Sequence, residues 1–248
     1  MRGTTVLVAM VVAMVVALGL VGCAGSRMPA PGDPLENVNR KTFAFNDGLD
    51  VYVVEPVAKG WHWVLPDAFE RGISRFFTNL GTPVVAANGL LQGKPVQAAT
   101  DLGRFAINTT VGLGFIDPAA EWGLKKHEED FGQTLAVWGV PGGPDVVLPL
   151  VGPSNPRDIA GLVVDSAMSV TPFFIDGFIT ASARVVSTIN TRAEVLDEVR
   201  EIKNASVDYY TAVRDGWQQR RDAAIKDGDP AARPVNDDLY YPDEQEKR

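Results

Sequence analysis

The only cysteine of this 248-residue chain, Cys23, directly follows an apolar N-terminal run that ends at Gly22. The combination of this run and a single cysteine constrains how the remaining residues can fold. Every residue from Val6 to Val21 is apolar or glycine, and Arg2 stands before the run. As a helix these residues would extend about 24 Å, short of the hydrocarbon core of about 30 Å. The run therefore predicts a cleaved secretory signal over residues 1–22. Without a second cysteine, the exported body cannot form an internal disulfide.

Cys23 itself predicts a lipid anchor. The residues Leu-Val-Gly-Cys that end at this position match the pattern accepted by bacterial lipoprotein signal peptidases. Several acyl chains anchor a protein stably, whereas one does so only marginally. Ala24, in place of an aspartate, favours the outer membrane of a Gram-negative bacterium, with the anchor on the periplasmic side. The alternative is an ordinary signal peptide beside which Cys23 stands by chance.

The charge balance limits the partners of the mature chain. In the full chain Asp and Glu outnumber Lys and Arg by 31 to 23, a net charge of −8, and removal of Arg2 with the signal leaves the mature chain at −9. Nucleic acids and anionic head groups are bound through basic surfaces, so no nucleic acid is expected as a partner. The proline-containing residues 23–34 predict an acylated, extended tether, and residues 227–248 predict a disordered acidic tail. One domain of residues 35–226 remains between them.

Helical periodicity runs through the first half of this domain. Residues 67–80 place their apolar side chains on one stripe, and Asp67 with Glu70 forms a helix-start signature. Gly81-Thr82-Pro83 is expected to end this helix, because proline and glycine both disfavour a helix interior. Pro83 would then open a second helix that runs as far as Leu91.

The second half predicts more helix and little sheet. One helix is expected from Pro95 to about Thr109, and a long one over residues 191–226, opened by a capping box of Thr191 and Glu194. Residues 145–150 could form a short strand, and the Gly- and Pro-rich residues 138–156 predict a structured hairpin or loop. No run of 18 apolar residues follows Cys23, so no lone membrane-spanning helix is expected. The expected fold class is mostly α, without a substantial β-sheet.

Motifs that carry chemistry are absent from the sequence. His62 and His127 are 65 positions apart, and neither belongs to a spacing typical of a metal site. His62, between two tryptophans, is expected to be an interfacial or packing residue, and His127 to be exposed in a charged run. No nucleophile elbow and no phosphate-binding glycine loop occurs. We therefore expect no enzyme, with no catalytic residues, metal or cofactor.

Five segments, in one order, resemble the VacJ/MlaA family of phospholipid-transport lipoproteins. They are DPLENVNRKTFAFN (33–46), TNLGTPVVAANGLLQG (78–93), RFAINTTVGLGFIDPA (104–119), FGQTLAVWGVPGGP (131–144) and LPLVGPSNPRD (148–158). The family often has a doubled glycine near Gly114, where this chain has one. Its hairpin often reads GVGxGP, whereas Pro141 here stiffens the loop and removes a backbone donor.

The resemblance implies a ring of helices in the inner leaflet of the outer membrane, beside porin trimers. Members of the family take glycerophospholipids that have strayed into the outer leaflet and pass them through an amphipathic channel to a soluble periplasmic carrier, which maintains lipid asymmetry. A polar passage inside an apolar exterior would lower the desolvation cost of moving a charged head group, without cofactor or ATP.

The resemblance also suggests roles for particular residues. Phe43, Phe45 and Asn46 would lie near the pore and help to hold its resting state. Gly139, Pro141, Gly142 and Gly143 would shape a hairpin bordering the channel. A membrane belt with interfacial tryptophans is expected from Trp61, Trp63, Phe69, Phe76, Phe77 and Leu80. The alternative for the belt is that these residues form an ordinary soluble core.

Two other functions remain open from the sequence. One is a structural envelope lipoprotein that tethers porins without carrying lipid. The other is an envelope hydrolase, which would need a nucleophile and a base that folding brings together, with only two histidines available. Co-purification with lipid extraction tests the tether, and release of fatty acid or lysolipid tests the hydrolase.

Overall fold

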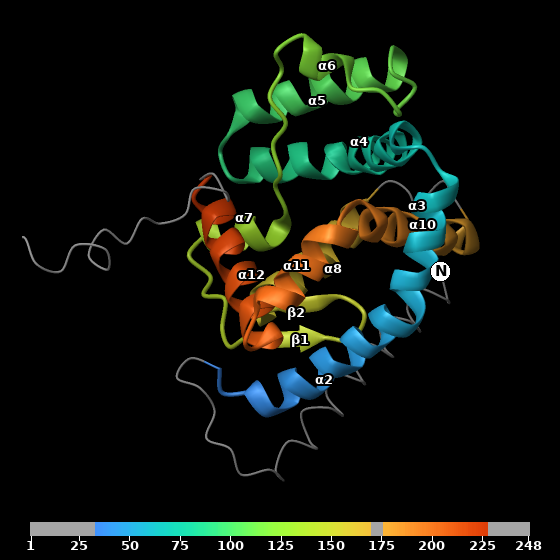
Figure 1. Cartoon of the computed structure of the whole chain (residues 1–248). Coiled ribbons are helices and arrows are strands. Elements are labelled where there is room, and N and C mark those ends of the chain that lie inside the picture. The colour runs from blue at the N-terminus through green and yellow to red at the C-terminus, as the bar shows by residue number, and fades with distance from the viewer. Residues whose placement is uncertain (1–32, 170–175, 228–248) are drawn as a thin grey trace, which may run out of the picture.

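The structure, a computed structural model, describes residues 33–169 and 176–227 of the chain (Figure 1). The signal peptide, Cys23, nearly all of the tether and the tail beyond Asp227 lie outside the described residues. Within them, no helix is both long enough and apolar enough to cross a bilayer.

The described residues are mostly helical, as the sequence predicts. The helices are α2 (Glu36–Leu49), the π-helical turn η1 (Asp50–Val54), α3 (Glu55–Val64), α4 (Asp67–Leu91), α5 (Pro95–Thr110), α6 (Pro118–Glu121), α7 (Phe131–Val137), α8 (Pro156–Met168), α10 (Gly177–Glu194), α11 (Leu196–Ala205) and α12 (Tyr209–Ile225). Strands β1 (Val146–Leu148) and β2 (Gly152–Ser154) pair antiparallel, with Val147 opposite Pro153. This two-stranded hairpin confirms the predicted hairpin between residues 138 and 156 and its first strand.

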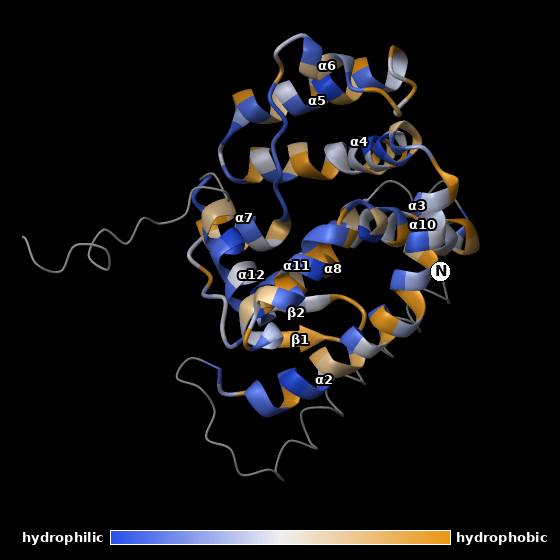
Figure 2. Ribbon diagram, in the orientation of Figure 1, coloured by the Kyte–Doolittle hydropathy of each residue, from blue (hydrophilic) through white to orange (hydrophobic). Residues whose placement is uncertain are grey.

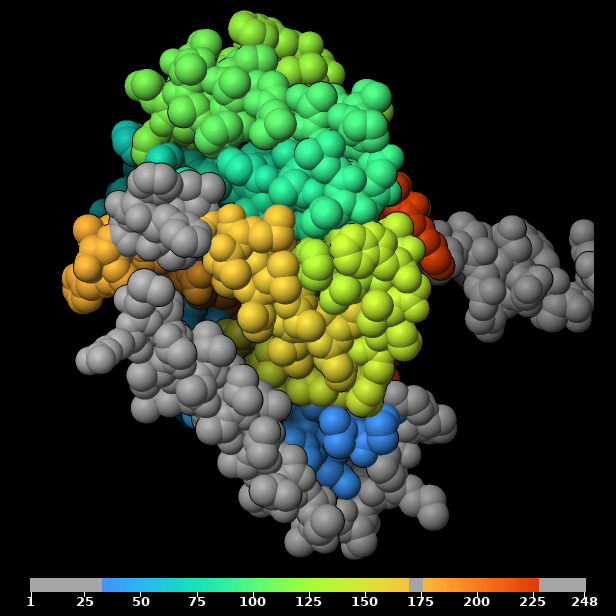
Figure 3. Space-filling view, turned by 180° about the vertical axis from the view of Figure 1, so that it is seen from behind, coloured from blue at the N-terminus to red at the C-terminus, as the bar shows by residue number. Residues whose placement is uncertain are grey.

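The elements follow a closed path in space. In Figure 1 the chain rises from α2 through α3 to α4 and α5 at the top, returns through α7 to the hairpin, and ends on α12. The contacts that close the path are α4 with α5, α3 with α10, α7 with α8 and α12, and α2 with β1. Seen from behind, α8 lies between α4 and α5 above and α2 below (Figure 3).

The first and last described helices meet through a cluster that we call the clasp. Tyr210 of α12 donates a hydrogen bond to the buried carboxylate of Asp33, and Arg40 of α2 forms an ion pair with Asp208. The ring of Phe43 packs edge-on against Tyr210 at 5.5 Å between centroids. Burial of the Tyr210 phenol and its bond to Asp33 both raise the pKa of Tyr210. The clasp therefore closes the path of elements between its two ends.

Helix starts follow local signals in the sequence. Asp130, Asn155 and Asp208 each precede a helix and accept a hydrogen bond from a backbone N–H in its first turn. Pro95 and Pro156 stand at first helical positions, where the missing N–H would have no partner in the helix. The helix predicted from Pro95 is confirmed as α5.

The predicted break at residues 81–83 is wrong. Helix α4 begins at Asp67 as expected but continues through Pro83 to Leu91. Proline removes one backbone hydrogen bond and Gly81 costs conformational entropy, but both are local effects. The helix packs against α5 along much of its length, with additional contacts to α7 and α10. Tertiary packing on several sides outweighs the local preference to stop.

The single helix predicted over residues 191–226 is also wrong. Thr191 and Glu194 lie in the last turn of α10, and the chain leaves helical geometry at Val195, with φ −116° and ψ 24°. A second break follows at Ser206, after which Asp208 caps α12. The helical spacing of the apolar residues continues across both breaks, so the periodicity did not reveal the turns.

The interior is unusually polar for a chain of this composition. The largest fully buried side chains are Asn39, Asn88, Asn190, Thr134, Asp33 and Asp101, whereas the buried hydrophobic residues are mostly alanines. Large apolar side chains instead lie outside, as with Tyr52 at 83 % exposed and Trp63 at 88 %. Figure 2 shows both kinds of residue along most helices. Packing therefore depends on specific hydrogen bonds more than on a hydrophobic core.

Candidate functional site

A cavity of about 640 Å³ lies among α4, α5, the segment that leads into α7, and α12. Its wall carries polar and charged groups from every one of these elements, among them Ser74, Thr78 and Asn79 of α4. Apolar side chains join them at Phe77, Val85 and Trp217. The cavity is thus amphipathic, and we refer to it as the central cavity.

Carboxylates on the cavity wall are held in ion pairs. Arg104 of α5 donates to Asp117 at 2.7 Å, and its other amino group donates to the carbonyl oxygen of Leu124. Burial of Asp117 would raise its pKa, but hydrogen bonds from Asn108 and Arg104 outweigh burial and lower it. The Arg104 side chain is 7 % exposed, so this pair forms a fixed part of the wall.

Glu129 shows how fully these carboxylates are paired. It is buried and accepts hydrogen bonds from Gln97 at 2.7 Å, from Gln92 at 2.8 Å and from Lys94 at 3.0 Å. These donors come from the turn between α4 and α5 and the start of α5. They fix the segment before α7 onto that helix pair, since a buried carboxylate left without donors would be costly.

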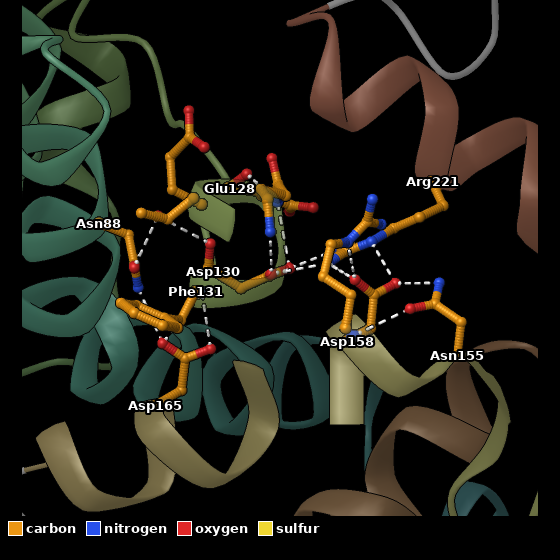
Figure 4. A network of polar contacts seen from close by, with 12 residues as sticks. Asn88, Glu128, Asp130, Phe131, Asn155, Asp158, Asp165 and Arg221 are labelled. Carbon is orange, nitrogen blue, oxygen red and sulfur yellow. Dashed lines mark hydrogen bonds and ion pairs between the residues drawn. The ribbon is translucent and has the colours of Figure 1, made fainter. Parts of the chain in front are cut away.

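A network centred on Arg221 joins three helices beside the cavity (Figure 4). Arg221 of α12 donates to Asp130 at 2.5 Å and to Asp158 at 2.8 Å, which lie at the starts of α7 and α8. Burial would lower the pKa of Arg221 and raise that of Asp130, but the hydrogen bonds and opposite charges around each group together outweigh burial, so the pKa of Arg221 is raised and that of Asp130 is lowered. Asn155 donates a further hydrogen bond to Asp158 at 2.9 Å.

A second set of contacts extends this network to α4. Asn88 donates to Asp165 of α8 at 2.8 Å and accepts from the Thr134 hydroxyl at 2.9 Å. The backbone N–H of Phe131 also donates to Asp165, at 3.0 Å. Burial raises the pKa of Asp165, although these donors partly offset it. Polar contacts thus join four helices, α4, α7, α8 and α12, to one another.

The predicted pore residues lie on α2, away from the central cavity. Phe43 faces α12 within the clasp, and Phe45 is exposed. Asn46 donates to the carbonyl oxygen of Leu148 and accepts from the N–H of Leu150, both at 2.9 Å, and so fastens α2 to the hairpin. Asn39, two turns earlier, makes the same two kinds of bond to the hairpin backbone. A role of these residues in a resting state stays a prediction.

The predicted hairpin glycines lead into the hairpin instead of forming its turn. Gly139 and Gly143 adopt positive φ, which side-chain-bearing residues rarely do, and Gly142 approaches the side chain of Asn155. The turn itself spans residues 149–151, between β1 and β2. Pro141 lies in the segment between α7 and β1. Whether this segment borders a channel stays a prediction.

The predicted belt residues divide into two groups. Trp63, Phe69 and Leu80 are exposed, as a membrane belt requires. Trp61 donates a hydrogen bond to the buried Asn190, Phe76 stacks on a neighbouring aromatic ring, and Phe77 lines the central cavity. Further exposed apolar residues that the sequence did not single out include Tyr52, Val96, Leu113, Trp122 and Phe178.

Each of the two histidines contacts a buried carboxylate, His62 one on α4 and His127 one on α5. His62 lies 3.0 Å from Glu70 of α4, and this hydrogen bond raises its pKa. His127 lies 3.0 Å from Asp101 of α5, and its side chain is only 28 % exposed, so the expectation that it is exposed is wrong. Among the described residues, no group of His, Cys, Asp and Glu could hold a metal ion.

Comparison with known proteins places this fold in a family. The profile of the family described as "MlaA lipoprotein" matches residues 31–224, most of the chain. The chain belongs to the MlaA lipoprotein family. A solved structure described as "Structural basis for maintenance of bacterial outer membrane lipid asymmetry" is 37 % identical, with a TM-score of 0.70, and covers 79 % of this chain and 100 % of its own.

Curated relatives of the family support the same assignment. The "Intermembrane phospholipid transport system lipoprotein MlaA" of Shigella flexneri is 37 % identical, over 89 % of this chain and 92 % of its own length. The protein of the same name from Haemophilus influenzae is 34 % identical, over 87 % and 90 %. An uncharacterized protein of Rickettsia felis is 35 % identical, over 78 % of each chain.

The residues that line the central cavity were missed by sequence reasoning. In the sequence Glu128, Glu129 and Asp130 form an acidic run of a kind that is usually solvated, whereas in the structure Glu129 is buried and Asp130 belongs to the Arg221 network. Gln97, which donates to Glu129, stands 32 positions away, and Arg221, which pairs with Asp130, stands 91 positions away. Only the helix-start position of Asp130 before an apolar segment could have been found from local spacing.

Proposed function

We propose that this protein is an outer-membrane lipoprotein that removes mislocalised glycerophospholipids from the outer leaflet. It passes them through its amphipathic interior towards a soluble periplasmic carrier and so maintains lipid asymmetry. Cys23 is the acylated anchor on the periplasmic side, and porin trimers hold the protein in place. The names of its relatives, which refer to phospholipid transport and to outer membrane lipid asymmetry, support this proposal.

One observation carries the proposal: polar residues are buried and large apolar residues are exposed. The fully buried side chains of highest volume are asparagine, threonine and aspartate, while Trp63, Val96 and Phe178 are each at least 80 % exposed. A soluble protein gains most of its stability from the opposite arrangement. An apolar exterior is favourable when it contacts acyl chains, and exposed tryptophans suit the boundary between lipid and water.

The central cavity supplies the complementary feature, a polar space inside this exterior. A phospholipid head group carries a phosphate charge, and moving it through hydrocarbon costs its hydration. Charged and hydroxyl groups on the cavity wall replace part of that hydration, while Phe77 and Trp217 can contact the first carbons of the lipid. Transfer then needs neither a cofactor nor nucleotide hydrolysis.

Gly81 offers a direct test of passage through the cavity. It lines the central cavity within α4, and no atom lies within 4 Å of the position that a Cβ would take. Gly81→Leu and Gly81→Trp therefore narrow the cavity without a local clash, and Leu also favours the helix. Gly103→Leu and Gly103→Trp in α5 are matched controls, because Gly103 has the same open surroundings but is not part of the cavity wall.

The assay uses cells that lack the native gene and carry one variant, with outer-leaflet phospholipid labelled by a membrane-impermeant amine reagent. We expect the Gly81 variants to accumulate surface phospholipid, Trp more than Leu, and the Gly103 variants to resemble the wild type. A Cys23→Ala protein should also fail, because it lacks the anchor. Normal asymmetry in both Gly81 variants, with retained porin association, would favour a structural tether. Release of lysolipid by the purified protein would favour a hydrolase.

A further inference from the structure

The central cavity contains two arginines whose charge no described carboxylate offsets. Four of the five carboxylates on its wall form ion pairs with lysine or arginine: Asp117 with Arg104, Glu128 with Lys126, Asp130 with Arg221 and Glu129 with Lys94. The fifth, Asp101, contacts His127 at 3.0 Å. Arg75 and Arg220 also line the cavity, yet neither makes an ion pair or side-chain hydrogen bond with any residue in the described ranges. They are the cavity cations left available for a ligand.

The accessibility of these two side chains separates them from the structural arginines. Arg75 and Arg220 are exposed, whereas the side chains of Arg104 and Arg221 are only 7 % and 15 % exposed. An exposed arginine on an outer surface is usually just solvated. These two instead line the central cavity, one from α4 and the other from α12, where four of the five wall carboxylates already pair with other lysines and arginines.

The neighbouring groups suit a phosphate that carries carbon chains. Guanidinium groups bind phosphate oxygens through two parallel N–H donors, more specifically than an ammonium group does. Trp217 stands one helical turn before Arg220, and Phe77 stands near Arg75 on α4; both line the cavity. A free inorganic phosphate has no apolar atoms to contact these surfaces, whereas the glycerol carbons and first methylenes of a lipid can pack against them.

We propose that Arg75 and Arg220 bind the phosphate diester of a glycerophospholipid while it occupies the central cavity. This inference rests on the proposed function and adds the chemical group that the cavity recognises. The phosphate diester is common to all glycerophospholipids, so the site distinguishes them from uncharged diacylglycerol and is tolerant of the head-group alcohol. The two arginines come from different walls, α4 and α12, so each can supply its own N–H donors to the phosphate.

The test measures binding by the full-length lipidated protein in detergent, with acyl-labelled phosphatidylglycerol, phosphatidylethanolamine and the matching diacylglycerol. We expect Arg75→Gln and Arg220→Gln each to weaken binding of both phospholipids by about tenfold, and the double variant by about a hundredfold. Binding of diacylglycerol should stay unchanged. Arg184→Gln is the matched control, because the side chain of this exposed arginine of α10 also makes no described ion pair or hydrogen bond but lies outside the cavity.

Each outcome bears on a different claim. Unchanged phospholipid binding in the double variant, or a parallel loss of diacylglycerol binding, would overturn the phosphate assignment and leave the transport proposal standing. Full competition by millimolar inorganic phosphate would also overturn it, since the site would then recognise free phosphate. Failure of the folded wild type to bind any phospholipid would refute the proposed function itself. Urea midpoints equal to the wild type exclude misfolding, because neither arginine loses a described partner.

Discussion

Replacing Gly161 with alanine should test whether α7 and α8 pack with their backbones in contact. A Cβ on Gly161 would lie 2.7 Å from the Cα of Gly132, closer still to the nitrogen of Gly132, and 3.1 Å from the carbonyl carbon of Phe131. Carbon atoms in contact prefer about 3.5–4.0 Å, so the two helices must separate by roughly 1 Å. No flexible side chain can move aside, because every one of these atoms belongs to the backbone.

The expected cost follows from what this separation disturbs. Overpacking in a well-packed site costs about 1–3 kcal/mol. Moving the start of α7 also strains the bond from the Phe131 N–H to Asp165 and the pairing of Asp130 with Arg221, each bond being worth about 1 kcal/mol. Replacing a helical glycine with alanine stabilises the folded state by up to about 1 kcal/mol, which offsets part of this cost. The net loss of unfolding free energy should be about 3 kcal/mol, a large part of a typical total of about 5–15 kcal/mol.

Urea unfolding of the detergent-solubilised protein, followed by far-ultraviolet circular dichroism, measures this difference. Gly103→Ala is the control, since the space around Gly103 is open and alanine is the better helix former; it should stabilise the protein by up to about 1 kcal/mol. If Gly161→Ala unfolded within about 0.5 kcal/mol of the wild type, a size typical of neutral surface changes, the close contact would be refuted.

Three further predictions concern single contacts. Asn46→Ala removes the two bonds that this side chain makes to the hairpin and should lower the unfolding free energy by about 1–2 kcal/mol in the urea assay; an unchanged midpoint would contradict these bonds. Tyr210→Phe leaves the buried Asp33 without its phenolic donor and should cost about 1–3 kcal/mol, whereas a neutral result would mean that the donor is dispensable. His62 should titrate above its ordinary pKa, and Glu70→Gln should return the pKa towards about 6.5, as followed by NMR. Because the folded-state pKa of His62 is raised, its stabilising contact is present below pH 6.5 and is lost as the pH rises through the folded-state value; identical titrations in both proteins would contradict the contact.

Local signals predicted much of the helical content. Pro95 opens a helix, Asp67 begins one, and the segment between residues 138 and 156 contains a hairpin, as expected. These features depend on a few residues that are neighbours in the chain, so they can be predicted from the sequence without knowledge of the fold. The break at Pro83 was wrong because contacts with α5, α7 and α10 outweigh a local penalty. The single helix over residues 191–226 was wrong because the apolar periodicity continues across the breaks at Val195 and Ser206.

The candidate site depended on pairings that a sequence does not display. Arg221 and Asp130 are 91 positions apart, and Lys94 and Glu129 are 35 apart. Each residue alone resembles a solvated surface charge, and only the fold tells which ones are paired and which remain free in the cavity. The exposed apolar exterior was partly expected from the family resemblance, although Trp61 and Phe77 turned out to face inward contacts.

The clasp sets the order in which the molecule can be assembled. Asp33 and Tyr210 are 177 positions apart, so the contact forms only after nearly all of the intervening chain is available. An exported chain that emerges from its N-terminus presents α2 early, while α12 is among the last segments to arrive. Until then Phe43 lacks its aromatic partners and is open to aggregation. During export, the incomplete chain therefore needs protection from aggregation until α12 is available. A chain truncated before Tyr209 should remain incompletely folded and prone to aggregation.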